Sequence, residues 1–120
     1  MLKVYARNLG NVAVICLQGR IVNGETRSLR EAVASQKHVD AIVLDLARVT
    51  AIDARGLGVL LELRRQTTAQ GINLRLINLN KFTTRVFEVT NLASVFEITS
   101  KREPAMSQAS SMRLPFAACA

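Results

Sequence analysis

An acid, an alanine, an arginine and a glycine separate two strongly apolar segments of this chain. They are Asp53, Ala54, Arg55 and Gly56, within the stretch TAIDARGLGVLLELRR at residues 50–65. A carboxylate at the start of a helix can accept hydrogen bonds from the free backbone N–H groups of the first turn. A glycine allows another segment to approach the backbone closely. The junction is therefore a catalytic site, a docking site or a capped turn, and the rest of the sequence must distinguish these.

Side chains suited to nucleophilic or acid–base catalysis are sparse. His38 is the single histidine, and it stands in QKHVD, which is predicted to be a turn. The sequence contains no GxSxG nucleophile motif and no GxxxxGK[ST] phosphate-binding loop. Asp45 and Asp53 are eight residues apart, on opposite sides of the predicted strand-to-helix transition, so their spacing does not pair them. One histidine and two cysteines without a CxxC pair leave too few ligands for a zinc site.

Gly56 and Gly58 follow a predicted strand and open a predicted helix, where a dinucleotide-binding fingerprint would lie. The position of the third glycine holds Leu61 instead. We therefore predict no catalytic residue, no metal and no cofactor. The protein is predicted not to be an enzyme, and a small α/β enzyme remains a distant alternative.

The chain is basic, with 16 Lys and Arg against 9 Asp and Glu and a formal net charge of +7. The basic residues are scattered along the sequence. With one Tyr, four Phe and no Trp, the chain offers little aromatic surface for stacking bases. We therefore expect no nucleic-acid partner, and a basic surface also suits an acidic protein partner.

Length and hydropathy predict one globular domain without a membrane segment. A chain of 120 residues can bury a core without metals or disulfides. No apolar run approaches the roughly 20 residues needed to span a bilayer. The start MLKVYARN lacks the layout of a secretory signal. We expect a cytoplasmic protein that does not insert into membranes.

Hydrophobic periodicity predicts an α/β fold with the order β-β-α-β-α-β-α-β. An antiparallel hairpin should lead into alternating units, which gives a mixed sheet with a parallel portion, packed with three to four helices. The predicted strands cover residues 3–7, 12–19, 40–49, 72–79 and 95–99, and the predicted helices cover 26–36, 54–69 and 82–92.

Two local expectations follow from the same patterns. The third strand should end near Ala47, which leaves the loop ARVTAID before a helix that starts near Ala54. In the last helix, Phe82, Val86 and Val89 have the spacing of a single helical face, with Phe87 as a further candidate.

The character of the chain changes after Ser100, because residues 101–120 contain two prolines and show no steady period. We expect a domain over residues 1–100 and a C-terminal tail over 101–120 that is partly disordered or loosely docked. Disorder is the simpler interpretation. The alternative is that apolar tail residues cover a patch or mediate self-association; these are Met106, Met112, Leu114 and Phe116.

The segment VLDLARVTAIDARGLGVLLELRR resembles the signature of STAS domains, the family of bacterial anti-anti-sigma factors. The resemblance runs from about Lys3 to Ile98. It includes GRIVNGETRSLREAV, which is similar to the segment before the family's first helix, and NLNKFTTRVFEVTNLASVFEI, which is similar to its closing helix and strand. It implies a STAS-like mixed sheet.

The resemblance also implies a mechanism. In typical members the residue after the aspartate is a Ser or Thr, which is phosphorylated by a partner kinase that is also an anti-sigma factor. The unmodified domain binds this factor and releases sigma, and phosphorylation breaks the complex. Here that position holds Ala54, which has no hydroxyl, so the family's phosphorylation site is absent. Thr50, four residues earlier, is expected to be a loop or turn residue.

Two functions remain open. The first is an anti-sigma factor antagonist that sequesters a GHKL-type serine kinase and is not switched by phosphorylation at Ala54. The second is an accessory or scaffold subunit of an ABC lipid transporter or a stress-signalling complex. Other STAS proteins or a second copy are further candidate partners. By analogy with the family, the loop from Arg20 to Arg27 should contribute to binding; the partner-binding candidates are Asn23, Glu25, Asp53, Ala54, Arg55, Gly56 and Leu57.

Overall fold

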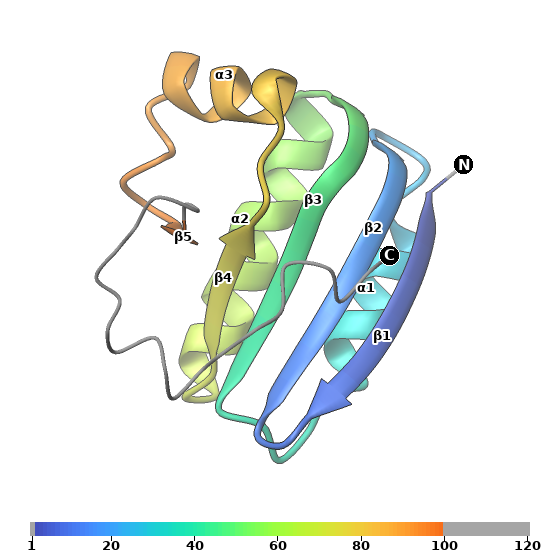
Figure 1. Ribbon diagram of the computed structural model, residues 1–120, viewed down its shortest axis with the longest axis vertical. Coiled ribbons are helices and arrows are strands. Elements are labelled where there is room, and N and C mark those ends of the chain that lie inside the picture. The colour runs from blue at the N-terminus through green and yellow to red at the C-terminus, as the bar shows by residue number, and fades with distance from the viewer. Residues whose placement is uncertain (1, 100–120) are drawn as a thin grey trace.

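Five strands form one mixed sheet in the spatial order β1-β2-β3-β4-β5 (Figure 1). The computed structural model describes residues 2–99, so the predicted tail over 101–120 and its apolar residues lie outside the described part. The elements are β1 (Lys3–Leu9), β2 (Val12–Ile21), α1 (Arg27–Ala34), β3 (Ala41–Ile52), α2 (Ala54–Ala69), β4 (Asn73–Ile77), α3 (Lys81–Val89) and β5 (Glu97–Thr99).

The predicted topology is confirmed. β1 and β2 form an antiparallel hairpin, and β3, β4 and β5 are each added in parallel to the strand before them. The element order is β-β-α-β-α-β-α-β. Three helices are found in residues 2–99, at the lower end of the predicted three to four.

α1 and α2 pack on one face of the sheet, and α3 lies across one end of it (Figure 1). α1 and α2 lie behind the strands in Figure 1. Alternate residues of the strands, such as Ile15 and Leu44, join helix residues such as Leu29, Leu60 and Phe87 in the main hydrophobic cluster. All five side chains are fully buried. This alternation is the period of two expected for a strand with one face against helices.

β3 extends further than the sequence pattern predicts. It continues to Ile52, so only Asp53 separates it from α2, and the expected loop over residues 47–53 is wrong. The continuous apolar run ends there, and residues 48–51 alternate polar and apolar side chains. Its strand conformation comes from pairing with β2, which reaches Ile21 opposite Ile52.

The predicted apolar face of the last helix is wrong at Phe82 and Val89, whereas the further candidate Phe87 is buried. Phe82 and Val89 are 41% and 69% exposed, while Thr83 and Phe87 are fully buried. Asn80 explains this rotation. Its side-chain amide donates to two carbonyls of β3, and its side-chain oxygen accepts from the N–H of Thr83 at 2.8 Å. This cap holds the first turn of α3 against β3 and directs Thr83 inward.

Candidate functional site

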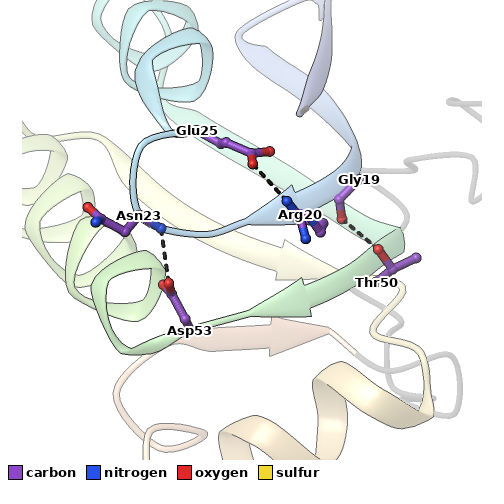
Figure 2. A network of polar contacts seen from close by, with 6 residues as sticks. All are labelled: Gly19, Arg20, Asn23, Glu25, Thr50 and Asp53. Atoms are coloured by element: carbon purple, nitrogen blue, oxygen red, sulfur yellow. Dashed lines mark hydrogen bonds and ion pairs between the residues drawn. The ribbon is translucent and has the colours of Figure 1, made fainter.

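Asp53 joins the start of α2 to the loop after β2. Its Oδ1 accepts from the Gly56 N–H at 2.7 Å, which makes it the N-cap of α2. Its Oδ2 accepts from the backbone N–H of Asn23 at 3.0 Å (Figure 2). One carboxylate therefore holds together two segments that are thirty residues apart.

The same two hydrogen bonds stabilise the charged form of Asp53. The N–H of Asn23 has the larger effect and that of Gly56 the next, and together they hold the pKa of Asp53 below its ordinary value of 3.8. The carboxylate is therefore ionised at neutral pH, and it already occupies the positive end of the α2 dipole.

We predict that Asp53→Ala lowers stability and that the loss depends on pH. A depressed pKa in the folded state contributes stability above the ordinary pKa, and this contribution is lost as pH falls through the folded-state pKa. The stability difference between wild type and Asp53→Ala should thus be constant near neutrality and shrink in acid. Urea denaturation across this range measures it. A difference that grows in acid would contradict the assignment.

Gly56 lies beneath the surface and brings α2 close to the end of β2. A Cβ at this position would lie 1.9 Å from the backbone oxygen of Ile21 and 2.7 Å from its carbonyl carbon. The same oxygen accepts from the Asp53 N–H at 3.3 Å. Gly56 is buried, so its role is to place the first turn of α2 rather than to present a side chain to a partner.

Ala54 and Arg55 are exposed, whereas Leu57 is half-buried and packs against the core. Ala54 and Arg55 line a depression of about 290 Å³ between the start of α1 and the first half of α2. Its lining residues come from the loop after β2 and from both helices: Asn23, Thr26, Arg30, Ala54, Arg55, Gly58, Val59 and Glu62.

The charge of this depression is dominated by two arginines. Neither Arg30 nor Arg55 forms a salt bridge with another residue of the described chain; Arg30 donates from Nε to the Thr26 hydroxyl at 3.4 Å. The one lining glutamate, Glu62, is neutralised by Arg65, whose hydrogen bond is the main reason that the pKa of Glu62 is lowered. The depression can therefore receive an acidic group.

The two partner-binding candidates in the loop after β2, Asn23 and Glu25, lie apart in the structure. Asn23 lies on the rim of the depression with Ala54 and Arg55. Glu25 instead pairs with Arg20 at 2.9 Å (Figure 2). It lines another hollow, of about 430 Å³, which does not include Ala54 or Arg55. Asn23 and Glu25 therefore lie on different parts of the protein surface.

Sequence reasoning missed several residues of the depression. Gly58, Val59 and Glu62 stand three, four and seven residues after Arg55, so helical periodicity could have found them. Arg30 carries no such signal, because only the packing of α1 beside α2 brings it there. Thr50 is not at the helix start; it lies within β3, and its hydroxyl donates to the Gly19 carbonyl at 3.3 Å (Figure 2).

Residues 2–99 contain neither a metal-binding cluster nor a membrane-spanning helix. No three His, Cys, Asp or Glu side chains gather there in a way that could hold a metal ion. No helix in the same range is long and apolar enough to cross a membrane.

The chain matches one family model and is similar to a curated protein. The family model of the STAS domain matches residues 3–105. BtrV of Bordetella bronchiseptica, provisionally named an anti-sigma factor antagonist, is 29% identical over 106 residues, which is 87% of this chain and 91% of BtrV.

Solved structures share the fold. A Thermotoga maritima protein, provisionally described as an anti-sigma factor antagonist, superposes with a TM-score of 0.74 at 20% identity, over 91% of this chain and 92% of its own. The anti-sigma factor antagonist SpoIIAA of Bacillus in its unphosphorylated form gives 0.70 at 19% identity, over 93% and 100% of the two chains. At this identity the likeness concerns architecture.

Proposed function

Because this chain belongs to the STAS domain family, we propose that it is an anti-sigma factor antagonist, a regulatory protein that sequesters an anti-sigma factor and so releases a sigma factor. The relative BtrV supports this, since it carries that name and aligns over nearly its whole length. A domain of this class works by binding, and the two arginines that line the depression suit that role.

The observation that carries the proposal is the surface at the start of α2. Ala54 and Arg55 are exposed there beside a depression of about 290 Å³. Asp53, which is also exposed, and the buried Gly56 hold the loop after β2 and the helix in place. An exposed and basic surface suits docking to an acidic patch of another protein.

The partner that we propose is an anti-sigma factor of the GHKL serine kinase type, in the cytoplasm. Such a kinase would find no acceptor at Ala54, because a methyl group cannot take a phosphate. The docking surface would therefore stay in its binding-competent form. Regulation would then act through the abundance of the protein or through a second STAS protein.

The test is quantitative capture of the kinase by wild type and by Ala54→Glu. The variant places a negative charge in the docking surface beside Asp53, so we expect binding about tenfold weaker or more. A glutamate in the first turn suits the helix dipole, so the loss would not come from unfolding. Titration of each immobilised protein with the purified kinase measures the change.

Ala69→Glu is the matched control, because Ala69 is exposed at the opposite end of the same helix. It should bind like wild type. Equal binding by all three proteins would contradict the site. Capture of an ABC ATPase from the native host, in place of a kinase, would instead favour the accessory-subunit function. Turnover of a small molecule that Asp53→Asn abolishes would indicate an enzyme.

A further inference from the structure

The face of the sheet opposite the helices carries a second hydrophobic cluster. Val14, Cys16, Val43 and Ile77 are between 0% and 9% exposed, with Val12 packed against them. No residue of the three described helices belongs to this cluster. In Figure 1 this face is turned toward the viewer, in front of β2, β3 and β4.

Charged residues flank the cluster along the sheet. Arg7, Val14, Val43 and Arg75 are successive partners across four strands. Residues paired in this way point to the same face of a sheet. The row is therefore apolar over β2 and β3, with arginines over β1 and β4, and Glu97 of β5 is paired with Arg75 at its end. The side chains of the cluster are at most 9% exposed although no described helix belongs to it, so a strip this apolar needs a cover from another part of the protein.

The chain itself leaves the described structure beside this strip. Thr99, at the end of β5, is paired with Ile77, a member of the cluster. From β5 to β2 is three strand spacings, roughly 14 Å, whereas the twenty residues that follow Ser100 can span roughly 65 Å when extended. This segment also holds the required apolar side chains, which are Met106, Met112, Leu114 and Phe116.

We propose that the C-terminal segment 101–120 binds across this face and covers the Val14–Val43–Ile77 strip. Covalent attachment gives the segment a high effective concentration at the strip. A second copy would have to bind without this attachment. The tail is the occupant that the exit point at Thr99 and the length of the segment favour.

The test is a single tryptophan placed in the full chain, which has none of its own. Phe116→Trp should show blue-shifted emission and slow acrylamide quenching compared with Lys37→Trp, whose position is exposed. The emission wavelength and the quenching rate of Phe116→Trp should not change when the protein is diluted. Quenching as fast as in Lys37→Trp would overturn the proposal, and protection that disappears on dilution would assign the face to a second copy instead.

A second substitution locates the contact. Val12 is half-buried at the edge of the cluster, so Val12→Glu should raise the quenching of the tryptophan at position 116. Leu61→Glu, at an exposed position on α2, is the matched control and should leave it unchanged. Circular dichroism verifies that both variants are folded. A tryptophan that stays protected in folded Val12→Glu would show that the segment binds elsewhere.

Discussion

Gly56→Ala should destabilise the fold by on the order of 3 kcal/mol, at the upper end of the cost of overpacking. The added Cβ would lie 1.9 Å from the backbone oxygen of Ile21, and this oxygen cannot retreat freely. It accepts a hydrogen bond from Asp53, and Ile21 is also paired with Ile52 in the sheet. The helix must move away instead, and the contacts of Asp53 with both segments weaken. Chemical denaturation of the two proteins measures the difference.

Gly58→Ala is the matched control in the same turn of α2. A Cβ there would meet nothing within 4 Å, and alanine is favoured over glycine in a helix interior by about 0.5–1 kcal/mol. This variant should be slightly more stable than wild type. If Gly56→Ala were stabilised to the same extent, the close approach of α2 to β2 would be wrong.

Ala54→Ser should create a phosphorylation site where the wild-type chain has none. The position is exposed in the first turn of α2, and it follows the aspartate as the acceptor does in the family's pattern. With the proposed kinase and ATP, we expect phosphate in the variant. The modified protein should then bind the kinase about tenfold more weakly or worse, because a phosphate adds about −1.5 to −2 charge beside Asp53. Mass spectrometry and a binding titration give the two readouts.

Ala69→Ser offers a hydroxyl at the far, exposed end of the same helix and should take up no phosphate. Wild type should also stay unmodified at Thr50, whose hydroxyl is bonded to the Gly19 carbonyl within the sheet. Phosphate on Thr50 would reveal a different switch. A variant that binds the kinase but accepts no phosphate would show that the partner lacks kinase activity toward this position.

The sequence alone determined the features that depend on neighbours in the chain. The periods of two and 3.6 residues set the order of strands and helices, and an aspartate before an apolar helix predicted the cap that Asp53 makes with Gly56. The absence of a hydroxyl at position 54 follows from the residue type. The family resemblance came from the same local patterns, and the match over residues 3–105 confirms it.

The tertiary structure decided the features that depend on distant segments. β3 reaches Ile52 because β2 pairs with it, and α3 turns Phe82 outward because Asn80 is bonded to β3. Arg30 lies beside Arg55 only because two helices pack next to each other. Each of these is a contact between segments far apart in the chain. Hydrophobic periodicity predicts which face of an element is buried, but it does not predict which other segment covers that face.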